Sequence, residues 1–313
     1  MAGAVFASAL TWPVQTAAES AAQYWRLSSG RLTVISNSSA QRCQRLAASV
    51  VRFDQLLFEL AGWEPDVALP PLQFYSLDRA AAKAVLLTES ERDKKNHSVV
   101  IHSKWLPGAE FDIAAIVDIG GDEPLQSVLF MYGQGQLAQG PTRTYPAWYQ
   151  LGVASLLNGV VIKPDGTVLL KRTLTFEAVV EKGARSASRF DLTKLLEGRP
   201  ETLAPAEFNA FVPQAREWAV FGLLTTAERR GQYHELALLM RQDASLEEAA
   251  LEAFGKPLAE VAAEFDQGAW RKDVRFRLPP PATPIALPDA TQIEPSQIEP
   301  LLRAVAERAQ SET

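Results

Sequence analysis

The segment from residue 122 to residue 159 constrains the fold most, because its turn and cap residues predict two consecutive helices. An acidic residue followed by a proline at 123–124 is a typical helix start. The first helix is expected to end near residue 140, Pro146 begins the second, and Gly159 ends it in a left-handed cap. The chain therefore predicts a helical centre against which other elements pack.

The residues on either side of this centre predict a fold that contains both strands and helices. Upstream, short β-branched runs alternate with apolar residues at helical spacing. The expected strands are 31–36, 72–76, 98–103 and 111–118, and the expected helices are 38–60 and 79–87. A hairpin is expected at 160–170, and the pattern is mainly helical from residue 205. The predicted fold class is α+β: a small mixed sheet with packed helices, followed by a mainly helical C-terminal half.

The chain is expected to have four parts. Residues 1–30 form an N-terminal segment, 31–275 the main domain, 276–295 a proline-rich linker and 296–313 a terminal helix. The N-terminal segment has an apolar stretch followed by small residues, as in a signal peptide, but no basic residues lead it. The compartment therefore stays open between export and the cytoplasm.

Composition excludes several classes of partner. The net charge is −6 and no basic block occurs, so nucleic acid and anionic membrane surfaces are not expected partners. No apolar run approaches the roughly 20 residues that cross a bilayer, and no transmembrane segment is expected. The single cysteine, Cys43, excludes an internal disulfide.

The second central helix resembles a motif of the peptidase MA-like gluzincins, a family of zinc metallopeptidases. Pro146, Trp148, Gly152 and Ala154 match the pattern Pro-x-Trp-x-x-Glu-Gly-x-Ala, but Leu151 stands where the family has its zinc-binding glutamate. Two later segments, 217–224 and 245–255, resemble later helices of the same family. The resemblance implies a gluzincin-like fold from about residue 31 to residue 270.

The same resemblance implies that the zinc ligands are missing. The family carries His-Glu-x-x-His on the first central helix, where the best register here gives Phe130, Met131 and Gln134. A shifted register would instead put Tyr132 and Gln136 at the two histidine positions. No histidine lies between residues 103 and 233. Neither register supplies the imidazole pair that zinc needs, so we expect no metal cofactor.

Two glycines, Gly133 and Gly135, interrupt the first central helix. Each costs about 1 kcal/mol relative to alanine in a helix. Either neighbouring elements approach this helix unusually closely, or the segment is partly unwound. The loose dinucleotide-binding pattern that begins at Gly133 lacks the long following helix that such a site requires.

The function predicted is that of a catalytically inactive metallopeptidase-like protein, which binds a peptide or protein or supports an assembly. The candidate binding cleft consists of Tyr132, Gln136, Trp148, Tyr149 and Gln150. Aromatic side chains next to amides are typical of recognition surfaces. For Trp148 itself, a role as an anchor of the core is the favoured explanation.

Two alternatives stay open. One is a hydrolase with a non-standard metal site at Asp118, Asp122 and Glu123. The other is a structural domain whose terminal helix docks on a partner.

Overall fold

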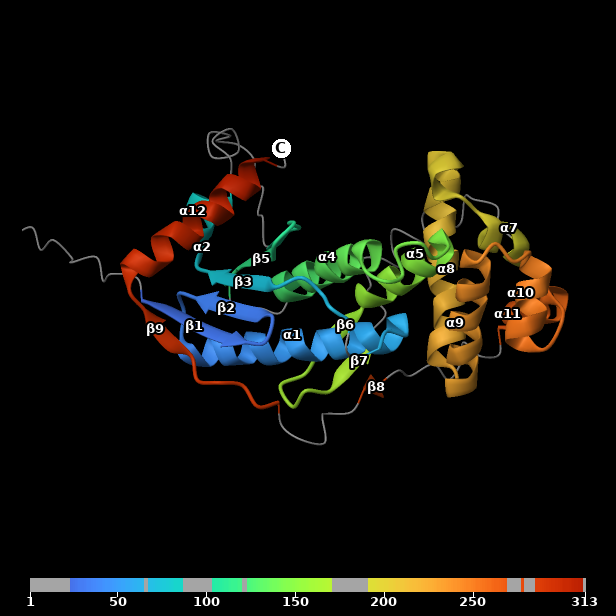
Figure 1. The fold of residues 1–313 in the computed structure, drawn as a ribbon, viewed down its shortest axis with the longest axis horizontal. Helices are drawn as coiled ribbons and strands as arrows, with labels where there is room; N and C mark the ends of the chain where they lie inside the picture. Colours follow the sequence, from blue (N-terminus) through green and yellow to red (C-terminus); the bar gives the residue numbers. More distant parts are fainter. Residues whose placement is uncertain are drawn as a thin grey trace, which may run out of the picture.

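The computed structural model describes residues 23–64, 67–86, 103–119, 123–170, 191–268, 277–278 and 285–311. It has the predicted mixed α and β class, with a six-stranded mixed sheet at one end and a group of helices at the other (Figure 1). Two elements, helices α1 and α4, run along the molecule between the two ends (Figure 1).

The large sheet has the strand order β4-β5-β3-β2-β1-β9. Its three central strands are parallel: β2 (Leu32–Ser36), β3 (Leu72–Leu77) and β5 (Asp112–Val117). The other three are β1 (Tyr24–Ser29), β4 (Ser103–Leu106) and β9 (Thr291–Ile293). Each of these pairs antiparallel with its neighbour, which makes the sheet mixed.

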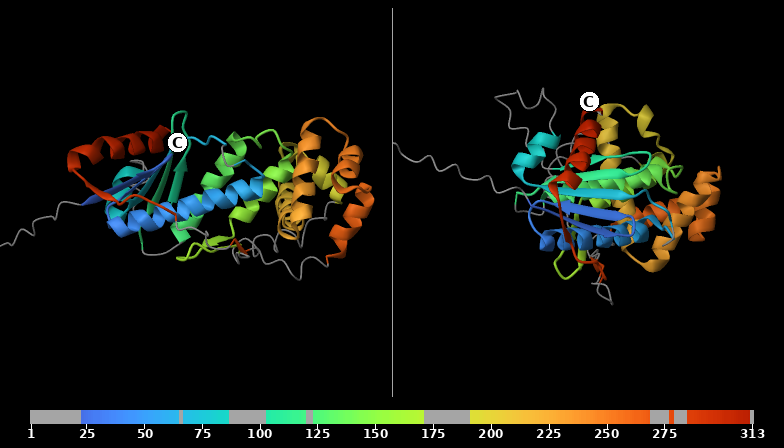
Figure 2. Two further views of the ribbon diagram at one scale, coloured as in Figure 1. Left: turned by 60° about the horizontal axis from the view of Figure 1, so that its bottom comes forward. Right: turned by 60° about the vertical axis from the view of Figure 1, so that its left-hand side comes forward.

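Helices cover both faces of this sheet (Figure 2). Alternate residues of the central strands point to opposite sides, so Val34 and Phe74 join one buried cluster while Ile35 and Tyr75 join another. The first face packs on α1 (Ala40–Ala61) and α4 (Glu123–Gln139). The second packs on α2 (Arg79–Leu86) and α12 (Pro295–Ser311).

The remaining elements build the helical end. The central pair continues from α4 into α5 (Ala147–Leu157), as predicted, but α5 ends at Asn158 with right-handed backbone (φ −64°) and not in the left-handed cap expected at Gly159. A second, small sheet consists of β6 (Val160–Ile162), β7 (Val168–Leu170) and β8 (Arg277–Leu278). The helices that follow are α7 (Leu192–Glu197), the 3-10 turn η1 (Pro200–Thr202), α8 (Pro205–Leu224), α9 (Ala227–Arg241), α10 (Leu246–Phe254) and α11 (Leu258–Gln267).

The cap residues end these helices where the sequence indicates. Ser245 and Glu248 form the expected reciprocal capping box at the start of α10. Gly62, Gly255 and Gly268 end α1, α10 and α11 with φ values of 63°, 68° and 65°. These left-handed conformations cost glycine little, so the three helices end sharply.

The sheet uses residues that the sequence analysis assigned to flanking segments. Residues 24–29, from the N-terminal segment 1–30, form β1, which pairs with β2 through the turn at Gly30. Residues 291–293, from the linker 276–295, form β9 and pair with β1. The sequence analysis missed β1 and β9 because each strand is short and is buried only through pairing with its neighbours. The strand expected at 98–103 overlaps β4 at Ser103, and its other residues lie outside the described part of the chain.

The terminal helix α12 packs on its own sheet. Ile298, Val305 and Ala309 are buried in the second cluster. The Arg308 guanidinium donates a hydrogen bond to the Phe111 carbonyl at 2.7 Å, and Lys104 Nζ donates to the Ala309 carbonyl at 3.0 Å. Among the described residues, no helix is long and apolar enough to span a membrane.

Removing the Ile298 side chain tests this docking. We expect Ile298→Ala to lower the free energy of unfolding by about 2–5 kcal/mol, because Ile298 is 3 % exposed and its loss leaves a cavity. Glu299→Ala, at the exposed neighbouring position, is the control and should change it by less than about 0.5 kcal/mol. Urea denaturation measures both variants, and equal stabilities would show that α12 does not contribute to the core.

Candidate functional site

The inner side of α4 carries the residues of the shifted register. Tyr132 and Gln136 are each 1 % exposed. The residues of the best register lie elsewhere on the helix: Phe130 and Met131 are half-buried and Gln134 is exposed. Phe130 and Met131 therefore pack at the edge of the main core, and Gln134 does not reach it. Leu151, on α5, is likewise half-buried and packs against the main core.

Tyr132 closes a polar network between α4, α1 and the sheet. Its hydroxyl donates a hydrogen bond to Asp54 Oδ1 at 2.9 Å and accepts one from Arg31 Nη2. The same guanidinium forms an ion pair with Asp54 and donates to the Pro70 carbonyl at 2.9 Å. The positive charge of Arg31 thus lies next to the Asp54 carboxylate, and the Tyr132 hydroxyl contacts both groups.

Gln136 makes the second polar contact of this face, one turn further along α4. Its Nε2 donates to Asp112 Oδ2 at 2.7 Å, and the Gly108 backbone N–H donates to Oδ1 at 3.1 Å. Asp112 is fully buried at the start of β5, and burial raises the pKa of its carboxyl, while these two hydrogen bonds and the nearby Arg31 oppose that rise. Burial also raises the pKa of Asp54, with Arg31 opposing it.

Sequence reasoning missed Arg31, Asp54 and Asp112. Two of them carried a usable signal. Asp54 falls on the apolar stripe of the helix that contains Phe53 and Leu57, and Asp112 opens an otherwise apolar strand. A charged residue at a core position needs a partner inside the fold. The partner's identity, however, depends on tertiary contacts.

The residues at the family's metal positions do not fit zinc. Phe130, Met131 and Leu151 offer no ligand that zinc favours, and Gln134 points away from the core. In the shifted register the polar atoms of Tyr132 and Gln136 are engaged with Asp54, Arg31 and Asp112. No group of three or more His, Cys, Asp or Glu side chains among the described residues could hold a metal ion. His97 and His102 lie outside those residues.

The two glycines of α4 are sites of close packing. A Cβ at Gly133 would lie 2.5 Å from Leu157 Cδ1, and one at Gly135 would lie 1.7 Å from the ring of Trp105. The helix is continuous through both positions, so the partly unwound alternative is wrong. The glycine pattern also lies inside a helix rather than in a loop before one, and therefore lacks the geometry of a dinucleotide site.

The predicted binding cleft is not assembled, because its aromatic residues belong to the core. Trp148 and Tyr149 are fully buried, and Trp148 packs edge-on against Tyr233 and Trp218 with ring centroids 5.1 and 6.4 Å apart. With Tyr132 and Gln136 also buried, four of the five residues present no open surface. The alternative that Trp148 is a core anchor is confirmed. The fifth residue, Gln150, is half-buried and donates to backbone carbonyls nearby.

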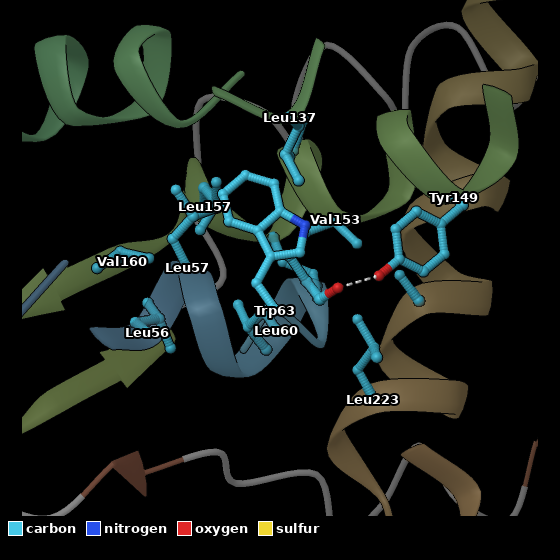
Figure 3. Packing of buried hydrophobic residues seen from close by; sticks show 14 of the residues in the cluster. Leu56, Leu57, Leu60, Trp63, Leu137, Tyr149, Val153, Leu157, Val160 and Leu223 are labelled. Atoms are coloured by element: carbon cyan, nitrogen blue, oxygen red, sulfur yellow. Dashed lines mark hydrogen bonds between the residues drawn. The ribbon is translucent and has the colours of Figure 1, made fainter. Parts of the chain in front are cut away.

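A further polar junction joins the end of α1 to the helical end of the molecule. Tyr149 Oη donates to the Ala61 carbonyl at 2.8 Å (Figure 3) and lies 3.0 Å from His234 Nδ1. Beside it, the Arg230 guanidinium pairs with Glu59 at 2.6 Å. Contacts from α1, α5 and α9 thus meet at one point, around which Trp63 and Leu60 fill the apolar space (Figure 3).

The alternative metal site at Asp118, Asp122 and Glu123 gains no support. Asp118 Oδ2 lies 3.3 Å from Arg42 Nε and accepts a hydrogen bond from Ser38 Oγ at 2.6 Å. An arginine at this carboxylate satisfies the charge that a cation would otherwise neutralise. Asp122 and the Glu123 side chain lie outside the described residues.

Comparison with known proteins gives no further information on this site. No protein-family model matches the chain, and no curated protein matches it. The site must therefore be judged from its own contacts.

Alanine substitutions at two helical glycines test the packing of α4. Gly135→Ala should lower the free energy of unfolding by about 1–3 kcal/mol, because the new Cβ meets Trp105. Gly231→Ala in α9 is the matched control: nothing lies within 4 Å, so it should raise stability by up to about 1 kcal/mol. Chemical denaturation measures both. A stabilising effect at Gly135 would mean that α4 and β4 do not pack as described.

Proposed function

We propose that this protein is a catalytically inactive, gluzincin-like member of the metallopeptidase-like folds and acts by binding a peptide or a segment of a protein. The observation that carries the proposal is the polar network on the inner side of α4. In the shifted register, this is the side of the helix that would hold the metal and its water in an active relative. Here Arg31, Asp54 and Tyr132, with Asp112 and Gln136, satisfy one another's charges and hydrogen bonds.

The gluzincin-like part of the proposal is supported by the residues that carry the resemblance. Trp148 packs on Trp218, and a Cβ at Gly152 would lie 3.0 Å from Ala219 Cβ and 2.7 Å from the Ala215 carbonyl. These residues therefore act together as the packing contact between α5 and α8. Because these residues have a packing role, the pattern can be present in a chain that lacks the glutamate ligand.

The surface we propose for the peptide is the partly exposed edge of α4 that adjoins strand β4, together with that strand. Met131 lies one turn before Gly135, which rests on Trp105 of β4, so both residues are on the side of α4 that faces this strand. Met131 is half-buried and Gln134 is exposed. A flexible thioether beside an amide suits the apolar side chains and backbone of a peptide.

Strand β4 gives such a peptide a backbone template. In the part of the chain that the structure describes, β4 pairs only with β5, on one side. An unpaired strand edge can accept an extended peptide as an additional strand, with affinity from main-chain hydrogen bonds and specificity from neighbouring side chains. The proposed ligand is therefore an extended peptide with apolar side chains.

Peptide selection on the purified protein tests this function. We expect a displayed random-peptide library to yield apolar sequences, and a fluorescent peptide from it to bind Met131→Lys at least about tenfold more weakly, because the lysine replaces an apolar contact. Leu251→Lys is the control. It also replaces an apolar side chain by lysine, at a position 57 % exposed on α10, far from α4 (Figure 1). Equal losses in both variants, or cleavage of the peptide by the zinc-supplemented wild type, would contradict the proposal.

A further inference from the structure

The junction at the end of α1 has a defined direction of proton donation. The Tyr149 hydroxyl has one proton, and it is donated to the Ala61 carbonyl, which cannot donate in return. The contact of 3.0 Å between Tyr149 Oη and His234 Nδ1 therefore requires that Nδ1 carry a proton and donate it. With the proton on Nδ1, the imidazole is neutral as long as Nε2 carries no proton.

The surroundings of His234 oppose a second proton. His234 Nε2 is buried and has no hydrogen-bond partner among the described residues. The ring lies against Gly62, where a Cβ would be 3.1 Å from three of its atoms, so the end of α1 packs directly on it. A proton at Nε2 would face this packed environment without an acceptor.

The charged and titratable groups around His234 come from three helices. Arg230 lies one turn earlier on α9 and is paired with Glu59 of α1. Tyr149 of α5 and Tyr233 of α9 contribute phenols, with ring centroids 5.8 and 6.1 Å from the imidazole. Burial raises the pKa of both phenols well above the ordinary value, so they stay neutral. Glu59 pairs with Arg230 and also interacts with Arg52, so an imidazolium would add a further positive charge beside these groups.

We infer that the His234–Tyr149–Ala61 relay is an acid-sensitive latch, which holds the end of α1 on α5 and α9 at neutral pH and releases it when His234 takes up a proton. The release is local: it frees the last turn of α1 and the first turn of α5 while the sheet stays folded. This inference concerns a different region from the proposed peptide surface and does not depend on it.

The direction of the pH effect follows from the pKa of His234. Burial, and then the nearby Arg230, lowers this pKa from the ordinary 6.5 to about 4. The open form, with an ordinary pKa, binds more protons between these values than the closed form does. The latch is thus at full strength above pH 6.5 and weakens as the pH falls toward 4. Linkage gives an increase of about 30-fold in the open-to-closed ratio at pH 5 relative to high pH.

Hydrogen exchange of the full chain, followed by mass spectrometry, tests the latch. Rates corrected for the intrinsic pH dependence of exchange should show protection at the end of α1 and the start of α5 falling by up to about 30-fold between pH 7.5 and pH 5. Strand β3 should keep its protection. In His234→Asn the side-chain amide can still donate to Tyr149 but does not titrate, so protection should change by less than about threefold.

Two results would overturn the inference. One is an equal loss of protection in His234→Asn and the wild type, and the other is a parallel loss in β3, which would indicate global unfolding. If His234→Asn does not fold, nitrogen NMR of the wild-type imidazole decides the matter. A proton on Nδ1 and a pKa below 5 support the latch, whereas a proton on Nε2 or a pKa near 6.5 contradicts it.

Discussion

The half-buried ion pair between Arg31 and Asp54 is the constraint on which the rest of the arrangement depends. A charged pair largely removed from water is tolerated only when each group finds further partners inside the fold. Tyr132 supplies one from α4, and Gln136 repeats the arrangement one turn later with Asp112 at the start of β5. These contacts fix both the rotation and the axial position of α4 on the sheet. The glycines of α4 then face their packing partners, Phe130 and Met131 pack at the edge of the core, and Gln134 is exposed.

The two ends of the molecule are joined by a second set of contacts. Helix α1 runs from the sheet to the helical end, where Tyr149 binds its last carbonyl (Figure 3). Around this point the aromatic rings of Trp148, Trp218 and Tyr233 pack edge-on or tilted rather than face to face. The motif that resembles the gluzincins is therefore built into the contact of α5 with α8 and α9, where it stabilises the fold independently of any metal chemistry.

Sequence reasoning succeeded where the signal was local. The capping box at Ser245, the glycine that ends α1 and the proline that precedes α5 each mark a helix end through backbone chemistry alone. It failed where the outcome depended on distant residues. Strand β9 pairs with β1 across most of the chain. Likewise, Tyr132 was predicted to line a cleft, because the sequence cannot show that Asp54 and Arg31 reach its hydroxyl inside the core.

The central claim is that the inner side of α4 is a closed structural contact and not a metal site. Zinc content per chain tests it most directly, measured by elemental mass spectrometry on full-length protein purified without chelator from zinc-supplemented growth. The account predicts far less than one equivalent, because the polar atoms that face the interior are engaged with one another. One full equivalent of zinc would contradict the account and would mean that other residues build a metal site.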